Sequence, residues 1–194
     1  MKDDENSIII KKNNYLNNSE YLSNFEYIDI CIDAVKNDPN ILQYIDKQTY
    51  EICMQAVKKN GLVLQYVEYQ TKEICIEAVK ENGYALQYVE YQTKEICIEA
   101  VKQNGYALQY VDVQELEICE YAIIQNIESI KYINIELPEL FYGIVSQNGE
   151  MIKHVKKYNH ELVVASLKNS FYNSIYISGN LKYYYMLMIL LRII

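Results

Sequence analysis

Hydrophobic and polar positions along the chain repeat with a period of 22 residues. The segment 73–80 (Glu-Ile-Cys-Ile-Glu-Ala-Val-Lys) recurs unchanged at 95–102, and 51–58 is nearly the same. A period of this size is typical of repeat proteins, in which each unit buries its apolar surface against its neighbours. The same register places cysteine at 31, 53, 75, 97 and 119, followed by Phe141 and Val163.

About seven units follow from this register, which runs from residue 29 to about residue 178. An acid recurs near the start of every unit, as Asp29, Glu51, Glu73, Glu95, Glu117, Glu139 and Glu161. A stack of units needs both ends covered, because its terminal faces are apolar. We therefore predict an N-terminal capping segment over 1–28, a repeat array over 29–178 and an apolar C-terminal cap or tail over 179–194.

The first half of each unit has the spacing of a short amphipathic helix. In the unit that starts at Thr71, this threonine is the expected N-cap, and Glu73 lies in the first turn, where the helix dipole favours an acid. The pair Asn82-Gly83 predicts the end of the helix, with glycine at C′. Helical spacing gathers one inward face of Ile74, Cys75, Ala78, Val79 and Asn82.

The second half of each unit, 83–90 in the same copy, is compatible with more than one conformation. We favour a short α-helix or 3-10 helix, which makes the chain an all-α solenoid of helical hairpins. The alternative is a strand over 88–91 in an α/β horseshoe of the leucine-rich type. The Leu-x-x-Leu-x-Leu-x-x-Asn strand signature of that class is absent from the sequence.

The repeated motif resembles a known family. The pattern Thr-x-Glu-Ile-Cys-x-x-Ala-Val-Lys-x-Asn-Gly-Tyr-Ala-Leu-Gln-Tyr-Val over 71–89 and 93–111 is similar to a repeat family of unknown function that is expanded in giant viruses of amoebae, the mimivirus group. The resemblance covers 29–133 well and 134–178 in degraded form. It implies a viral repeat scaffold in the host-cell cytoplasm or the virion, and it carries over no catalytic residue.

Composition limits the classes of function. The chain has 194 residues, a net charge of −8, 21 tyrosines and no tryptophan. The acidic balance disfavours a nucleic-acid binder that ignores sequence, because such proteins neutralise phosphates with clustered lysine and arginine. The tyrosine content agrees with a genome rich in A/T codons.

Candidate chemistry is sparse. Equivalent cysteines in adjacent units are expected roughly 8 to 10 Å apart, beyond the range of a disulfide, and no metal-ligand spacing accompanies them. We interpret them as a row of buried thiols. The only histidines are His154 and His160, and no nucleophile motif or phosphate-binding loop is present. The sequence therefore predicts no catalytic, cofactor or metal site, and no enzyme.

Two polar positions also repeat. Asn60, Asn82, Asn104, Asn126 and Asn148 are expected to cap helices, with their amides bonded to the neighbouring unit. A glutamine–tyrosine ladder is the candidate partner-binding site, either as a binding surface or as tyrosines packed between layers beside solvated glutamines. It consists of Gln43, Tyr44, Gln65, Tyr66, Gln87, Tyr88, Gln109 and Tyr110, continued by Lys131, Tyr132, Lys153 and His154.

These observations favour a non-enzymatic scaffold for protein–protein interaction with an unidentified host or viral protein. The alternative is a solenoid that binds single-stranded nucleic acid through the glutamine–tyrosine ladder. The acids Asp46, Glu68, Glu90 and Asp112, three residues after each ladder glutamine, argue against it. The apolar segment 181–194 is expected to cap the array, with self-association or peripheral membrane attachment as alternatives.

Overall fold

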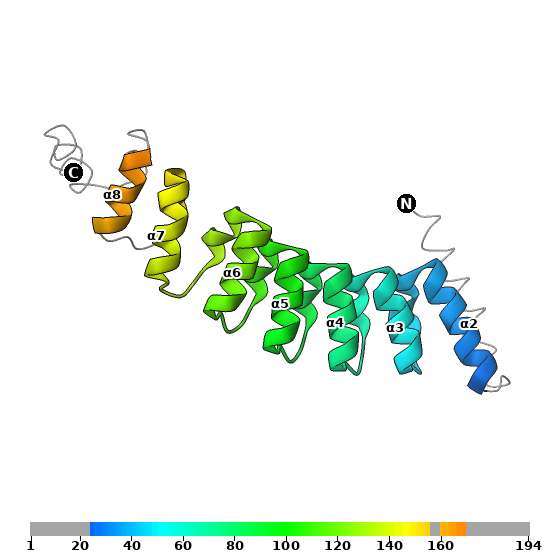
Figure 1. The fold of residues 1–194 in the computed structure, drawn as a ribbon. Coiled ribbons are helices and arrows are strands. Elements are labelled where there is room, and N and C mark those ends of the chain that lie inside the picture. Colours follow the sequence, from blue (N-terminus) through cyan, green and yellow to red (C-terminus); the bar gives the residue numbers. More distant parts are fainter. Residues whose placement is uncertain (1–23, 156–159, 170–194) are drawn as a thin grey trace, which may run out of the picture.

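The computed structural model describes residues 24–155 and 160–169 as a row of helical units (Figure 1). Each complete unit consists of one α-helix followed by one 3-10 helix (η). The elements are α2 (Asn24–Asn37), η1 (Pro39–Tyr44), α3 (Tyr50–Lys59), η2 (Gly61–Tyr66), α4 (Lys72–Glu81), η3 (Gly83–Tyr88), α5 (Lys94–Gln103), η4 (Gly105–Tyr110), α6 (Leu116–Gln125), η5 (Ile127–Tyr132), α7 (Pro138–Gln147), η6 (Gly149–His154) and α8 (His160–Asn169).

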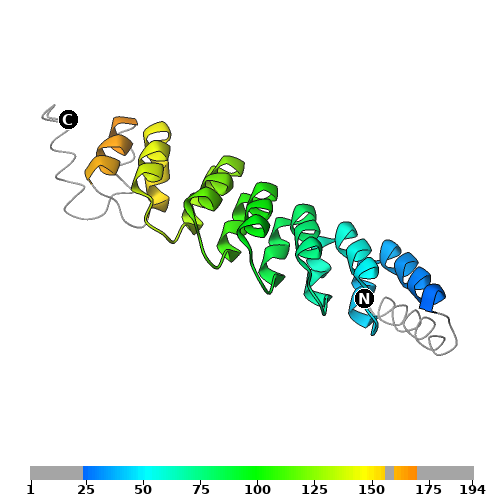
Figure 2. The same ribbon diagram turned by 60° about the horizontal axis from the view of Figure 1, so that its bottom comes forward.

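This architecture confirms the α-solenoid. No strand occurs in the described ranges 24–155 and 160–169, so the leucine-rich horseshoe, which needs one strand per unit, is wrong for them. The α-helices lie side by side in one layer, and the 3-10 helices form a second layer beside it (Figure 2). Each α-helix from α3 to α6 packs on the α-helix before it and on the 3-10 helix of the preceding unit. Contacts are therefore made between sequence neighbours, as a one-dimensional stack requires.

A threonine is the N-cap residue of each of the helices α3, α4 and α5. The Oγ1 atoms of Thr49, Thr71 and Thr93 accept a hydrogen bond from the backbone N–H three residues later, at 3.3 to 3.4 Å. This is the N-cap predicted from the sequence, and it satisfies one of the amides that the first turn leaves without a helical partner. The helices α6 and α7 begin without a side-chain cap, at Glu115 and Leu137.

Each asparagine of the repeated row joins the two helices of its own unit. The backbone N–H of Asn82 donates to Ala78 O and ends the α-helix, while Asn82 Oδ1 accepts from the N–H of Tyr84 at 3.0 Å and starts the 3-10 helix. Asn60, Asn104, Asn126 and Asn148 do the same, and Asp38 caps η1. Helix capping is confirmed, but the expected amide bond to the neighbouring unit is wrong, because the side chain turns back to its own chain segment.

The core is a continuous seam between the two layers. The predicted inward face of α4 is buried at Ile74, Cys75, Ala78 and Val79, while the opposite positions Glu73 and Lys80 are exposed. The 3-10 helices contribute a fully buried leucine or isoleucine to the same seam, at Leu42, Leu64, Leu86, Leu108, Ile130 and Ile152.

Glycine is the first residue of most of the 3-10 helices. The sequence suggested that it is needed there as the C′ residue of the preceding α-helix, but the structure gives a different reason. Gly83 is the first residue of η3, and neither it nor Gly61 or Gly105 has the positive φ expected of a glycine at C′. A Cβ on Gly83 would instead lie 2.5 Å from the carbonyl oxygen of Ala100 in the next α-helix. Glycine is required because the backbone of the following unit comes so close.

The first helix is longer than the others. Helix α2 starts at Asn24, so the last residues of the predicted capping segment 1–28 belong to it. The remainder of that segment, 1–23, and the predicted C-terminal segment 179–194 lie outside the described residues. The expectations for the ends of the array therefore stay predictions.

Candidate functional site

The glutamine–tyrosine ladder occupies the last two positions of each 3-10 helix from η1 to η6. Its glutamines are exposed, but their side chains fold back on their own helix. Gln87 Nε2 donates to the carbonyl oxygen of Tyr84 at 3.0 Å, and Gln43, Gln65 and Gln109 make the equivalent bond at 3.0 to 3.1 Å. The amides are thus engaged locally and face solvent.

The ladder tyrosines are half-buried and pack between units. The rings of Tyr84 and Tyr110 meet edge to face with centroids 6.0 Å apart, and Tyr106 and Tyr132 repeat this geometry one unit later. Such pairs stabilise packing beyond the area that they bury. The Lys131 ammonium lies 4.7 Å from the Tyr106 ring centroid. Tyr66, Tyr88, Tyr110 and Tyr132 also pack against the core, so the array itself uses these rings in part.

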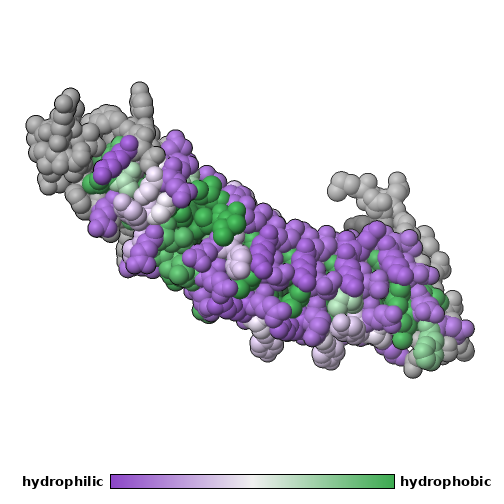
Figure 3. Space-filling view, viewed as in Figure 1, coloured by the Kyte–Doolittle hydropathy of each residue, from purple (hydrophilic) through white to green (hydrophobic). Residues whose placement is uncertain are grey.

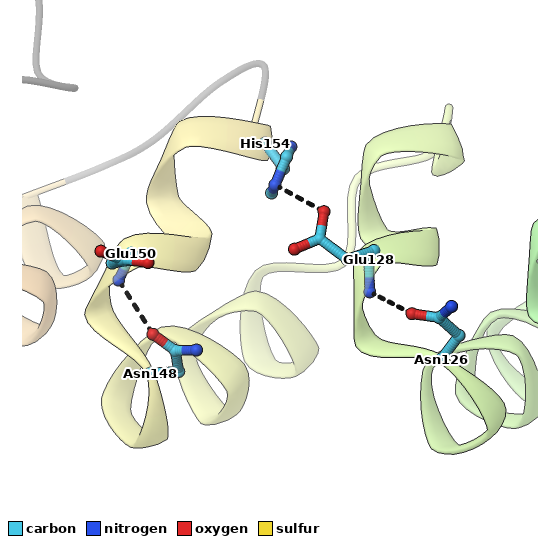
Figure 4. Close-up of polar contacts among 5 residues, drawn as sticks. All are labelled: Asn126, Glu128, Asn148, Glu150 and His154. Carbon is cyan, nitrogen blue, oxygen red and sulfur yellow. Dashed lines mark hydrogen bonds and ion pairs between the residues drawn. The ribbon is translucent and has the colours of Figure 1, made fainter.

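The ladder ends differently at its last step. His154 occupies the position of Tyr132 one unit on, and Glu128 occupies that of Tyr106. His154 Nε2 lies 3.2 Å from Glu128 Oε2, between η6 and η5 (Figure 4), and this contact is an ion pair only when His154 is protonated. Burial lowers the pKa of His154, an effect that Glu128 opposes. Lys153, beside it, is exposed.

A second row of glutamines, which was not among the residues predicted from the sequence, connects successive units. Gln92 Nε2 donates to Tyr110 O at 2.7 Å, and Gln92 Oε1 accepts from the N–H of Asp112 at 3.0 Å. Both partners lie in the next unit. Gln48, Gln70 and Gln114 make the same pair of bonds. Their period of 22 residues was visible in the sequence and would have revealed them.

A third set of hydrogen bonds connects the first residue of a 3-10 helix to the α-helix of the next unit. The backbone N–H of Gly83 donates to Gln103 Oε1 at 2.7 Å, and that of Gly105 donates to Gln125 Oε1 at 2.6 Å. Glu81 accepts from Gly61 in the same way. This bond cannot form one unit earlier. The position of the glycine is occupied there by Pro39, which has no N–H, and the position of the acceptor by Lys59. These bonds again cross from one unit to the next.

The five cysteines are buried, free thiols, as predicted. Desolvation by burial raises the pKa of Cys53, Cys75, Cys97 and Cys119 to about 11, and it also raises the pKa of Cys31. The Sγ of Cys75 lies 3.5 Å from Gln70 Oε1, so the thiol donates weakly to the bridging amide. Because the thiolate is the reactive form, these cysteines are packing groups at neutral pH.

We expect the array to lose stability in alkali. A thiol with a raised folded pKa stabilises the fold fully below its unfolded pKa near 9, and this contribution is lost as the pH rises through about 11. The urea midpoint, followed by circular dichroism from neutral pH to pH 11, should fall most steeply in this window. The Cys75→Ala variant should show a shallower fall, and an unchanged midpoint across the window in the wild-type chain would contradict the prediction.

An exposed edge runs along the loops that precede the α-helices. Tyr69, Tyr91 and Val113 stand at the same position of three successive units and are 80%, 83% and 74% exposed. The carboxylates just before them, Glu68, Glu90 and Asp112, are exposed as well. The sequence pattern alone does not distinguish these residues from the other repeated tyrosines and valines. We call Tyr69, Tyr91 and Val113 the aromatic edge.

Other chemistry is not indicated by the described part of the chain. No group of three His, Cys, Asp or Glu side chains within 24–155 and 160–169 could hold a metal ion. In the same ranges, none of the helices has both the length and the apolar character that a membrane crossing demands.

Comparison with known protein families finds the same repeat in the chain. The family model described as domain of unknown function (DUF4116) matches four overlapping windows, 27–72, 49–93, 71–116 and 93–137, each spanning about two units. No curated protein and no solved structure matches the chain. Since the windows together cover more than half of the sequence in the register of the helical units, the chain belongs to the DUF4116 family of repeat domains.

Proposed function

We propose that this chain is a non-enzymatic scaffold that binds another protein through the aromatic edge. The observation that carries this proposal is the repetition of nearly fully exposed aromatic rings, Tyr69 and Tyr91, at one position of successive units. Single exposed apolar side chains are ordinary, but these rings form a row because the units stack in register. Tyrosine offers a large contact area at little cost in side-chain entropy, which suits it to protein interfaces.

The array supplies a rigid support for this edge. Tyr69 and Tyr91 lie just after residues whose backbone N–H groups, at Glu68 and Glu90, are held by Gln48 and Gln70 of the preceding unit. The loop that presents each ring is thereby fixed to the stack. A fixed loop loses little conformational entropy on binding, which favours affinity.

The alternative proposal, binding of single-stranded nucleic acid by the glutamine–tyrosine ladder, has less support. The ladder amides bond to their own helix, and its rings are half-buried between units. The exposed carboxylates Glu68, Glu90 and Asp112 follow the ladder closely and would repel phosphates. A salt titration with single-stranded RNA distinguishes the two, because affinity that rises steeply at low salt would favour the alternative.

The location and source of the partner stay proposals that rest on the family resemblance. A viral repeat protein in an infected cell would meet host or viral proteins, and we propose one of these as the partner. The predicted self-association through 181–194 concerns residues outside the described ranges.

Replacing both edge tyrosines should weaken binding of the partner without weakening the fold. In a Tyr69→Ser/Tyr91→Ser variant we expect affinity for the partner to fall by about tenfold or more, while the free energy of unfolding changes by less than about 0.5 kcal/mol. The measurement is quantitative capture from eukaryotic cell lysate, followed by titration of the purified partner against both chains.

A matched control is Tyr142→Ser, which removes an exposed tyrosine from α7 and should leave the affinity unchanged. If the double variant retains every partner at wild-type affinity, the aromatic edge is not the binding surface.

A further inference from the structure

The row of units is interrupted at one place. Successive α-helices from α2 to α6 pack against one another, and α7 packs against α8. Between α6 and α7, within the described residues, this side-by-side packing is reduced to a marginal contact at most, and so is the packing of α7 on η5, whereas α6 packs closely on η4. Figure 1 shows the wider separation at this step. The two 3-10 helices η5 and η6 remain in contact across it.

The connecting loop does not explain the interruption. Residues 133–137 join η5 to α7, and the regular loops 67–71, 89–93 and 111–115 have the same length. The cause must lie in the side chains that face the next unit.

At this step Ile127 has a bulky side chain at a position where the preceding units have glycine. It occupies the first position of η5, where the preceding units have Gly61, Gly83 and Gly105. At Gly83 even a single Cβ would come 2.5 Å from a carbonyl oxygen of the next α-helix, so a side chain at this position forces that helix to shift. The compact ring of Pro39, at the same position of η1, still allows α3 to pack on η1 and α2, whereas the longer, branched side chain of Ile127 needs more room. In agreement, the three glycines are buried, whereas Ile127 is 39% exposed.

The polar link of the regular steps is lost at the same place. The backbone N–H of Gly105 reaches Gln125 Oε1 at 2.6 Å. The corresponding pair one unit later is Ile127 and Gln147, and no hydrogen bond joins them in the structure, although both are described residues. Gln147 is exposed instead.

The apolar surface opened by this separation is visible on the molecule. Leu140 of α7 is half-buried, whereas the residues at its position in α3 to α6 are almost completely buried. Figure 3 shows a hydrophobic area over α6 and the side that faces α7. At this step Ile135 and Leu137 of the loop pack against the core, and Glu128 contacts His154.

We propose that Ile127 divides the array into two stacks, α2 to η5 and α7 to α8, joined by a hinge at residues 133–137. The regular steps of the first stack have a close backbone approach at glycine and a link from that glycine N–H to Gln103 or Gln125. Neither feature is present at Ile127, so bending concentrates there. The Glu128–His154 pair, at the positions of the Tyr106–Tyr132 pair one unit earlier, is a polar contact that spans the hinge. The hinge lets the second stack change its orientation relative to the aromatic edge on the first.

The test is a pair of distance distributions measured by double electron–electron resonance. Spin labels are introduced through unnatural amino acids, since the five native cysteines make thiol labelling ambiguous. One pair, at Glu120 and Lys168, spans the hinge, and the other, at Lys58 and Glu120, lies within the first stack; all three positions are exposed. We expect a broad distribution across the hinge and a narrow one within the stack.

The Ile127→Gly variant should narrow the distribution between Glu120 and Lys168 to that of the control pair, because α7 can then approach η5. Its backbone amide at position 127 should also gain protection from hydrogen exchange as it reaches Gln147. The matched control is Ile124→Lys, which removes an exposed apolar side chain of α6 and restores the lysine of Lys80 and Lys102 at this position. It should leave both distributions unchanged.

Two results would overturn the proposal. A wild-type distribution between Glu120 and Lys168 as narrow as that between Lys58 and Glu120 would show that no hinge exists. A distribution that stays broad in Ile127→Gly would show that this side chain does not cause the separation.

Discussion

Gly83→Ala is expected to lower the free energy of unfolding by about 3 kcal/mol, because the added methyl group overlaps the backbone of the next unit. Its Cβ would lie 2.5 Å from Ala100 O, 2.9 Å from Gln103 Oε1 and 3.0 Å from Asn104 Cβ. The nearest of these atoms is backbone and cannot turn aside. The helix α5 must therefore move away, and it loses its contact with η3 and the bond between the Gly83 N–H and Gln103.

Urea unfolding followed by circular dichroism measures this loss, and hydrogen exchange shows where it acts. Since the stack is held by nearest-neighbour contacts, protection should fall most in the units on either side of Gly83.

Gly143→Ala is the matched control for this glycine substitution. Gly143 lies in the interior of α7, and a Cβ there would meet nothing within 4 Å. Alanine has the higher helix propensity, so this variant should gain about 0.5 to 1 kcal/mol. The two substitutions are chemically identical and are expected to have opposite signs. A loss at Gly83 no larger than about 0.5 kcal/mol would contradict the role of close backbone approach.

Gln92→Ala should cost about 2 to 3 kcal/mol, because it leaves two backbone groups of the next unit without their partner. Gln92 bonds the carbonyl oxygen of Tyr110 and the N–H of Asp112 with opposite ends of one amide. The weak bond from Cys97 to Gln92 Oε1 is lost as well. Both the urea midpoint and the exchange protection of the Asp112 amide should fall.

Two further variants show whether the loss of stability comes from the hydrogen bonds between units or from removing any glutamine side chain. Gln92→Glu keeps the acceptor for Asp112 but places a carboxylate against Tyr110 O in place of the donor, so it should not restore stability. Gln109→Ala removes an exposed glutamine that bonds only its own helix, through Tyr106 O, and should cost less than about 0.5 kcal/mol. If Gln92→Ala and Gln109→Ala are equally mild, the bridging glutamines do not hold the units together.

Only part of the candidate surface could be predicted from the sequence period. The period revealed the glutamine–tyrosine ladder, and the structure places every member of it on the 3-10 helices. It did not indicate that Tyr84 and Tyr106, four residues earlier, would take part in ring pairs with ladder tyrosines of the next unit. The sequence also did not indicate which tyrosines are exposed. Tyr88 and Tyr91 lie in the same repeat, yet Tyr91 is 83% exposed and Tyr88 packs against the core.

The sequence by itself determined the repeat length, the helix of each unit with its threonine and asparagine caps, and the buried row of cysteines. These features depend on hydrogen bonds between residues two to four positions apart and on helical periodicity, and both can be read along the chain. Only the tertiary structure decided why Gly83 must be glycine, what Gln92 binds and where the array separates at Ile127. Each of these depends on how closely the backbone of one unit approaches atoms about 20 residues away, a distance that packing between units sets.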